Sequence, residues 1–236
     1  MAIAIHNSTP AVVSGASATQ TTASFSPPGG SLLVACVGWE RLAEPAAATT
    51  MSNTGSPLTW TQRVIRNDED ATGFNAYATI LTAPNPASQT ITVTATSARA
   101  TDTGGMKIFV VTGADLVTPV GAIGEDSSTT QNLTVTAYTS TRAASRAFGC
   151  ATDFLARGVP TSSDTGFGWD VATKVSGIAV HKAADTALAG SSVTLNFAAA
   201  AANPSWNWVA VEILPETPLA PRPYVLGQAV QRAATW

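Results

Sequence analysis

Short runs in which apolar and polar residues alternate are the sequence feature that most limits how this chain can fold. Residues 90–95 are the clearest example, because Ile91, Val93 and Ala95 fall on one side and threonines on the other. Successive side chains of a β-strand point to opposite faces, so this pattern is typical of a half-buried strand. Clusters of Gly, Pro, Asn, Asp and Ser separate the runs, as turns do. The chain is therefore predicted to be all-β.

Two runs are apolar on both faces. Residues 31–39 and residues 106–111 contain almost no polar position, which is the pattern of a strand covered from both sides. A length of 236 residues is within the range in which β-sandwiches stay single domains. We therefore expect these runs to form central strands of one sandwich.

The second half of the chain repeats the order of the first. Four matches carry this interpretation: the strand of Cys36 with that of Cys150, Trp60 with Trp169, Ile91 and Val93 with Val193 and Leu195, and residues 108–111 with 209–213. The expectation is that neither half covers its own apolar face alone, so that two sheets pack together. The sequence thus predicts a single antiparallel sandwich of jelly-roll type over residues 1–215. It would contain 8–10 strands in two diverged pseudo-repeats, about 10–115 and 116–215.

Composition excludes several classes of protein. The 12 basic and 15 acidic residues give a net charge of −3, whereas a nucleic-acid-binding protein needs a basic surface. Charged residues are only 11% of the chain, and 43 Ala and 34 Thr take their place. No apolar run approaches the roughly 20 residues that span a bilayer, so no membrane contact is expected. Residues 1–6 lack the basic start and long apolar stretch of a signal peptide.

Nothing in the sequence marks an enzyme or a cofactor site. The chain has two histidines, His6 and His181, and no Gly-x-Ser-x-Gly, phosphate-binding or dinucleotide-binding motif. A Ser-His-Asp arrangement could assemble across space around His181 and Asp185, but no serine lies on a recognisable sharp turn. His181 is therefore predicted to be a surface or interface residue, and no catalytic residue and no cofactor are assigned.

Two other groups are predicted to be purely structural. The acidic run Asp68-Glu69-Asp70 does not have the spacing of a calcium loop and is predicted to be a solvated hairpin loop. Cys36 and Cys150 lie inside apolar runs and are predicted to be buried free thiols, with a disulfide between them as the alternative. No metal site is assigned.

The pair Trp206 and Trp208 is a candidate contact site. Both point to one face of the run 206–213, while Val209, Val211 and Ile213 point to the other. If the valine face is core, the two indoles stand on the outer face, where they could bind a glycan ring or a partner subunit. The alternative is that loops or the returning C-terminal segment cover them. A glycan platform would use Trp206 and Trp208, with Trp39 as a third ring.

The composition changes after Leu214. Four prolines fall within the nine residues 215–223, which favours an extended segment, and apolar residues follow it. A free tail would be polar, so this C-terminal arm, residues 216–236, is predicted to dock on its own sandwich or on a neighbouring subunit. The predicted assembly residues are Pro218, Pro221, Pro223, Tyr224, Val225, Leu226, Val230 and Trp236.

Several motifs together resemble a family. They are Thr-Trp-Thr at 59–61, Leu-Thr-Ala-Pro at 81–84, Val-Thr-Gly-Ala-Asp at 111–115, Trp-Val-Ala-Val-Glu-Ile at 208–213 and Arg-Pro-Tyr-Val-Leu-Gly-Gln-Ala at 222–229. In this order they are similar to jelly-roll-like β-sandwich domains in structural proteins of tailed phages of high-GC bacteria, and in related bacterial surface modules. The likeness covers roughly residues 10–215.

The resemblance implies a non-enzymatic virion protein, either a decoration or minor capsid protein of the head or a minor tail protein. Its partners would be other capsid or tail subunits, and it would be made in the host cytoplasm and exposed on the outer surface of the virion. A homo-oligomer is expected, with a trimer as the predicted cyclic form. The alternative function is a carbohydrate-binding or adhesin module that recognises a host surface glycan.

Overall fold

A computed structural model describes residues 2–41, 49–69, 75–154 and 158–217. These residues form sixteen β-strands and no helix, and therefore no helix long and apolar enough to cross a membrane. The strands are β1 (Ala4–Ile5), β2 (Val13–Gly15), β3 (Thr19–Thr21), β4 (Ser31–Arg41), β5 (Thr50–Asn53), β6 (Thr61–Glu69), β7 (Asn75–Asn85), β8 (Val93–Thr96), β9 (Gly104–Thr112), β10 (Val120–Ser128), β11 (Asn132–Thr139), β12 (Arg146–Asp153), β13 (Thr165–Val171), β14 (Val175–His181), β15 (Ser192–Ala198) and β16 (Trp206–Ile213).

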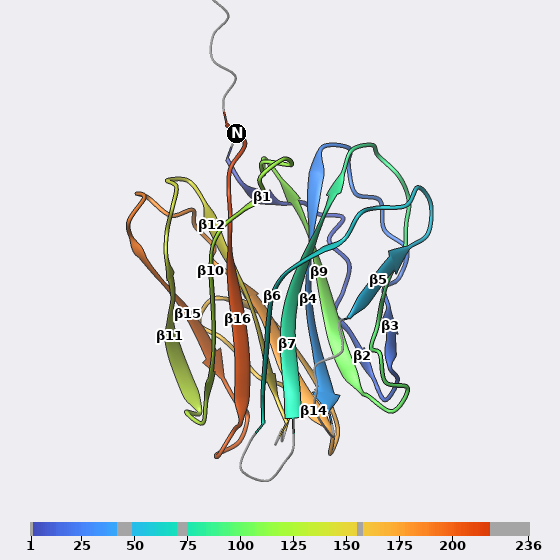
Figure 1. The fold of residues 1–236 in the computed structure, drawn as a ribbon, viewed down its shortest axis with the longest axis vertical. Helices are drawn as coiled ribbons and strands as arrows, with labels where there is room; N and C mark the ends of the chain where they lie inside the picture. Colours follow the sequence, from blue (N-terminus) through green and yellow to red (C-terminus); the bar gives the residue numbers. More distant parts are fainter. Residues whose placement is uncertain (1, 42–48, 70–74, 155–157, 218–236) are drawn as a thin grey trace, which may run out of the picture.

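The strands form four sheets that are stacked as layers (Figure 1). The first half of the chain supplies an inner sheet, β1-β9-β4-β7-β6 with β2 also on β9, and an outer sheet, β3-β8-β5. The second half supplies an inner sheet, β10-β16-β12-β14-β13, and an outer pair, β11-β15. All strand pairs are antiparallel. The all-β antiparallel sandwich predicted from the alternating runs is confirmed.

Strand β4 shows why its sequence is apolar on both faces. Leu32, Val34 and Cys36 point into the core between the two inner sheets, and Leu33 and Ala35 point into the core under the outer sheet β3-β8-β5. All five side chains are fully buried. Burial of a leucine-sized side chain contributes about 1.5–3 kcal/mol, so strands covered twice supply much of the stability.

The expected number of strands was too low, because each half covers its own inner sheet. The outer sheets bury separate clusters, one beneath β8 with Ile91, Val93 and Ala95, and one beneath β11 and β15 with Leu195 and Phe197. The sequence predicts 8–10 strands in two layers, whereas the described residues form sixteen in four. Strands β1, β2, β3 and β5 have only two to four residues, which is too short for an alternating pattern to be recognised.

The inner sheets of the two halves have the same strand order. The series β9-β4-β7-β6 in the first half corresponds to β16-β12-β14-β13 in the second. The strands matched in sequence, such as β4 with β12 and β9 with β16, occupy equivalent places. In the second half the pairing is nested, β10 with β16, β11 with β15 and β12 with β14, as in a folded-over hairpin. The jelly-roll type and the division into pseudo-repeats remain predictions.

One indole fills the interface between the two inner sheets. Trp169 of β13 is 2% exposed and lies against three glycines of neighbouring strands. A Cβ atom added to Gly105 would lie 2.5 Å from the indole, one on Gly177 2.4 Å and one on Gly38 3.0 Å. Real Cβ contacts are not that short, so glycine is required for the sheets to close around the ring. This slot, formed by Gly38, Gly105 and Gly177 around the Trp169 indole, connects β4 and β9 of the first half to β13 and β14 of the second.

Replacing Trp169 by alanine is expected to lower the free energy of unfolding by about 3–5 kcal/mol, because the rigid slot cannot collapse around the void. Urea unfolding followed by circular dichroism measures the change. Trp60→Ala is the matched control, since this indole is only half-buried and lies outside the interface. A loss for Trp169→Ala no larger than that for Trp60→Ala would contradict the role of the slot.

Candidate functional site

The point where the chain leaves the sandwich is firmly held. Residues 214–217, here called the arm root, run beside residues 113–119, the linker between the two halves. Ala114 and Pro215 form an isolated β-bridge. Three backbone hydrogen bonds of 2.8–2.9 Å join the segments: Leu214 N–H to the Pro119 carbonyl, Asp115 N–H to the Leu214 carbonyl, and Glu216 N–H to the Gly113 carbonyl.

A buried carboxylate braces this region from below. Glu212 is fully buried and accepts hydrogen bonds from Ala122 N–H at 2.9 Å, from Thr141 N–H and Oγ1, and from Arg142 N–H at 3.2 Å. Burial raises the pKa of Glu212, but hydrogen bonds from Ala122, Ser145 and Thr141 together outweigh it, so the pKa lies below its usual value. The charged carboxylate therefore holds the loop over residues 141–142 against β16.

The same loop reaches the arm root through a guanidinium group. Arg142 Nη1 donates to the Pro215 carbonyl at 3.1 Å and to Thr217 Oγ1 at 3.4 Å, and it lies 3.8 Å from Asp115 Oδ2. The chain is thus fixed to the sandwich by side chains and backbone as far as Thr217. A force applied to the chain beyond Thr217 would therefore be transmitted to the linker and to β16.

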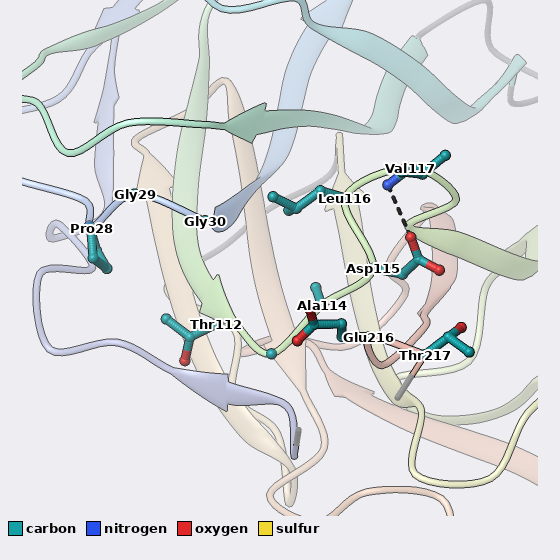
Figure 2. Close-up of a pocket in the computed structure, with 11 residues that line it drawn as sticks. Pro28, Gly29, Gly30, Thr112, Ala114, Asp115, Leu116, Val117, Glu216 and Thr217 are labelled. Atoms are coloured by element: carbon teal, nitrogen blue, oxygen red, sulfur yellow. Dashed lines mark hydrogen bonds between the residues drawn. The ribbon is translucent and has the colours of Figure 1, made fainter. Parts of the chain in front are cut away.

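A cavity of about 570 Å³ opens beside the arm root (Figure 2). Three segments from distant parts of the sequence meet there: the turn before β4, the linker, and the root itself. The backbone of Gly113 has φ +75°, and a Cβ there would lie 2.2 Å from the Ala2 carbonyl oxygen, so only glycine fits. The lining residues are Pro28, Gly29, Gly30, Thr112, Gly113, Ala114, Asp115, Leu116, Val117, Glu216 and Thr217.

The cavity combines an apolar lining with an acidic rim. Val117 is 93% exposed, and Leu116 is partly buried. Asp115 Oδ1 accepts hydrogen bonds from the N–H groups of Val117 and Thr118, and the bond from Thr118 contributes most to lowering the pKa of this carboxyl group. Glu216 is exposed and makes no ion pair with any other residue that the structure describes. An apolar ligand with a positive charge would match this surface.

The predicted assembly residues lie outside the described part of the chain. The structure describes the chain up to Thr217, so nothing tests the roles predicted for Pro218, Pro221, Pro223, Tyr224, Val225, Leu226, Val230 and Trp236. What the structure adds is the place from which this segment starts.

The predicted exposed tryptophan pair is wrong. Trp206 is 1% exposed and Trp208 is 6% exposed, because the outer pair β11-β15 covers this face of β16. Trp39 is fully buried as well. The alternative interpretation is confirmed in that the indoles are covered, but the cover comes from strands β11 and β15, which that interpretation did not name. These residues therefore form no platform for stacking sugars.

His181 does not belong to a catalytic triad. Its Nδ1 donates a hydrogen bond to the Lys182 carbonyl at 2.8 Å, and its ring packs among Phe109, Phe148 and Phe167. Burial lowers the pKa of His181, which keeps the ring neutral at physiological pH. Its predicted surface or interface position is wrong in that the residue is only 7% exposed in the folded chain.

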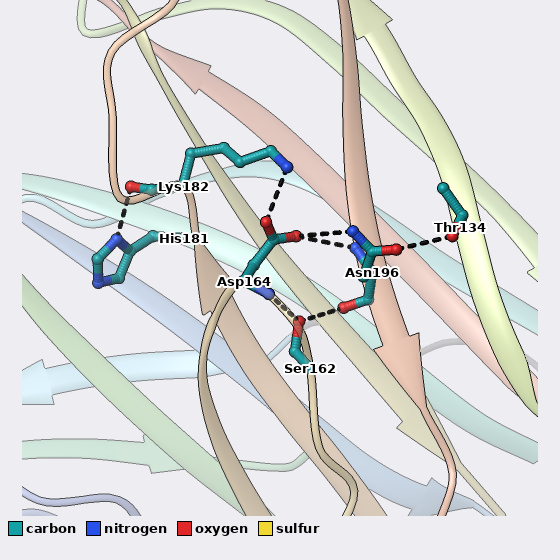
Figure 3. A network of polar contacts seen from close by, with 6 residues as sticks. All are labelled: Thr134, Ser162, Asp164, His181, Lys182 and Asn196. Atoms are coloured by element: carbon teal, nitrogen blue, oxygen red, sulfur yellow. Dashed lines mark hydrogen bonds and ion pairs between the residues drawn. The ribbon is translucent and has the colours of Figure 1, made fainter.

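Asp185, the candidate acid for a triad with His181, has another partner. Asp185 forms an ion pair of 2.7 Å with Arg146. Asp164 interacts electrostatically with His181, but its carboxylate accepts hydrogen bonds from Lys182 Nζ at 2.7 Å and from Asn196 N–H at 3.0 Å (Figure 3).

The hydroxyl group of Ser162, in the same network, is also used in hydrogen bonds. Ser162 Oγ donates to the Asn196 carbonyl at 2.6 Å and accepts from Asp164 N–H at 2.9 Å, so its proton points to the backbone. Thr134 Oγ1 donates to the Asn196 side chain at 2.7 Å. Figure 3 shows the ring of His181 turned toward the Lys182 carbonyl rather than toward Ser162. The network ties β11, β15 and the turn before β13 together, and it holds no activated nucleophile.

Cys36 and Cys150 are free and buried, as predicted. Each thiol lies 3.6 Å from a backbone carbonyl of the other half, Cys36 from Gly149 and Cys150 from Val37. Burial raises the pKa of Cys36 well above its usual value, so the group is a thiol and not a reactive thiolate.

The acidic run offers no described metal site. The predicted hairpin loop is wrong for Asp68 and Glu69, because their backbone belongs to β6 and pairs with Ala76 and Asn75 of β7. Asp70 and the side chains of Asp68 and Glu69 lie outside the described residues. Within the described ranges no group of three or more His, Cys, Asp or Glu residues could hold a metal ion.

Comparison of the chain with protein-family models, with curated proteins and with solved structures found no match. The interpretation of the site therefore rests on the contacts described above.

A buried lysine at the edge of the interface was missed by the sequence analysis. Lys107 of β9 is 3% exposed, donates to the Pro10 carbonyl, and lies 4.2 Å from the ring centroid of Phe167 and 5.7 Å from that of Phe109. Burial lowers the pKa of Lys107 to about 8. The available signal was a single lysine within the apolar run 106–111.

Lys107 is expected to make stability depend on pH. Its pKa is 10.5 in the unfolded chain and about 8 in the folded one, so folding disfavours the charged form. The penalty is complete below pH 8 and disappears as the pH rises through 10.5. Relative to Lys107→Met, the wild-type chain should gain about 1 kcal/mol of unfolding free energy between pH 7 and pH 9.

Urea unfolding of both proteins at several pH values measures this difference. Tyr138, whose pKa is raised by burial, is present in both proteins, so its effect cancels. Cys36 interacts with Lys107, but burial raises the pKa of Cys36 well above its usual value, so it stays a thiol in both folded proteins over this range. A constant difference across this range would show that Lys107 is not buried as described.

Proposed function

We propose that the chain is a non-enzymatic structural subunit of a tailed-phage virion. It would be exposed on the outer surface, either on the head as a decoration or minor capsid protein, or on the tail as a minor tail protein. The C-terminal arm, residues 216–236, attaches it to neighbouring subunits, and the homo-oligomer predicted from the sequence is part of this proposal, with three copies as the expected number.

The observation that carries the proposal is the bracing of the arm root. The chain is held up to Thr217 by Arg142 and the linker, and Glu212 holds Arg142 in place. A force applied to the arm would therefore be transmitted to the sandwich and would not first detach residues 214–217 from it. Burying a charged carboxylate costs free energy unless the group is fully hydrogen-bonded. A C-terminal segment that bound nothing would not require such a group to fix its first residues.

The body of the molecule also suits a building block. Four layers with three hydrophobic cores between them suit a rigid unit, since strands buried on both faces have a high free energy of local opening. The polar groups around His181 and Asp164 are used in structural contacts, so among the described residues no constellation supports catalysis.

The glycan-binding alternative loses its basis. It relied on Trp206, Trp208 and Trp39 as exposed rings, and all three are buried. No other observation in the described part of the chain favours a sugar site, and a host glycan is not proposed as a partner.

Removal of the arm tests its role in assembly. A chain ending at Thr217 is expected to keep the thermal unfolding midpoint of the full chain, because the described cores lie within residues 2–217. It should lose the oligomer that light scattering after size exclusion detects for the full chain. Equal masses for the two oligomers would place the interface on the sandwich and contradict an assembly role for the arm.

Presence in the virion tests the location. Antibodies against the full chain should label the outside of purified particles from the source of the sequence in immunogold electron microscopy, and mass spectrometry should find the chain in those particles. If the chain is abundant in the infected-cell lysate and absent from particles, the virion proposal is overturned, whatever the protein does alone in solution.

A further inference from the structure

We infer that the cavity beside the arm root is the receptor for the arm of a second copy of this chain. The occupant is the segment Arg222-Pro223-Tyr224-Val225-Leu226. This inference rests on the proposed function and adds to it the partner and the site of the contact.

The chemistry of the cavity fits this segment. The lining is apolar, with Leu116 and the exposed Val117 beside the backbone of Gly29 and Gly30, and Figure 2 shows Leu116 reaching toward those glycines. A volume of about 570 Å³ lies within the range of roughly 300–1,000 Å³ that is usual for ligand sites. Large aromatic and aliphatic side chains are the usual anchors in such pockets.

Charge complementarity points to the same segment. Asp115 and Glu216 lie on the rim, and Arg142 is positioned to offset only the former, at 3.8 Å from its carboxylate. Arg222 directly precedes the apolar residues of the arm and is one of two arginines beyond Thr217, the other being Arg232. We therefore pair Arg222 with Glu216.

The geometry of the root favours a second copy over the same chain. Glu216 and Thr217 themselves line the cavity, so the arm begins at its edge. Three of the six residues 218–223 are proline, which favours an extended spacer of about 3.1 Å per residue, or roughly 19 Å. A spacer of this length gives Tyr224 the reach to the cavity of a neighbouring copy.

An arm that enters the next copy makes a head-to-tail contact. Such contacts close into rings when the rotation between copies allows it and otherwise form open arrays. The exchange therefore accommodates the trimer predicted from the sequence as well as other ring sizes. It also explains why a surface-exposed valine such as Val117 stands beside the root.

Charge reversal in the full chain tests the contact. Glu216→Arg and Arg222→Glu should each weaken self-association about tenfold or more, since each places like charges together. The double variant should restore association. Two controls alter charge elsewhere: Thr129→Arg, which adds one positive charge at an exposed position beyond the far end of β10, and Arg232→Glu, which matches the charge reversal of Arg222→Glu within the arm. Analytical ultracentrifugation measures the dissociation constants, and thermal melts confirm that each variant is folded.

Mixing the two single variants distinguishes exchange from folding back. With exchange between copies, the arm of the Glu216→Arg chain fits the cavity of the Arg222→Glu chain, so a tagged form of one should co-purify with the other. If only the double variant recovers and the mixture does not, the arm occupies its own cavity and the inference is overturned.

Three other results would also overturn it: charge reversals no stronger than the controls, a monomeric full chain at all concentrations, or failure of the double variant to recover. The proposed function fails separately. If the oligomer is lost on removal of the arm but is unaffected by Glu216→Arg, this inference fails and the virion proposal does not. If the chains exchange arms but the protein is absent from particles, only the virion proposal fails.

Discussion

The close packing of the two inner sheets around Trp169 is the contact on which the rest of the structure depends. An indole can enter between the sheets only where Gly105, Gly177 and Gly38 leave room, since a Cβ at any of them would lie 3.0 Å or less from the ring. Cys36 and Cys150, which are small, lie in the same core. This contact fixes one half of the chain on the other and determines where the linker must run.

The layered arrangement follows from that contact. Once one face of each inner sheet is used for the interface, its other face still has to be covered, and the short outer sheets do this within each half. Each half thus resembles a small sandwich with an extra apolar face, and the pair of halves becomes one stable body. The low proportion of charged residues, 11%, is explained in the same terms, because strands buried on both faces leave few positions for charge.

The sequence predicted the parts of the fold that depend on period and on long apolar runs. The run containing Cys36 is a doubly covered strand because both of its faces are apolar, and periodicity reports this directly. Periodicity could not predict which element covers a given face. The sequence therefore left open whether Trp206 and Trp208 are exposed, and the structure shows β11 and β15 over them. The cavity at the arm root was also beyond prediction. Gly30, Leu116 and Glu216 come together only through the tertiary fold, and no local pattern marks such a meeting.

The linker between the halves has three roles at once. It joins the two inner sheets, it pairs with the arm root through the bridge between Ala114 and Pro215, and it lines the cavity with Leu116 and Val117. Its path is set by the packing of the halves, and its turn is held by hydrogen bonds to Asp115. The shape of the cavity is therefore fixed by the same core that fixes the body. In the arm exchange proposed above, each copy would present the cavity and the start of its arm in a constant relation, which is what repeated head-to-tail contacts require.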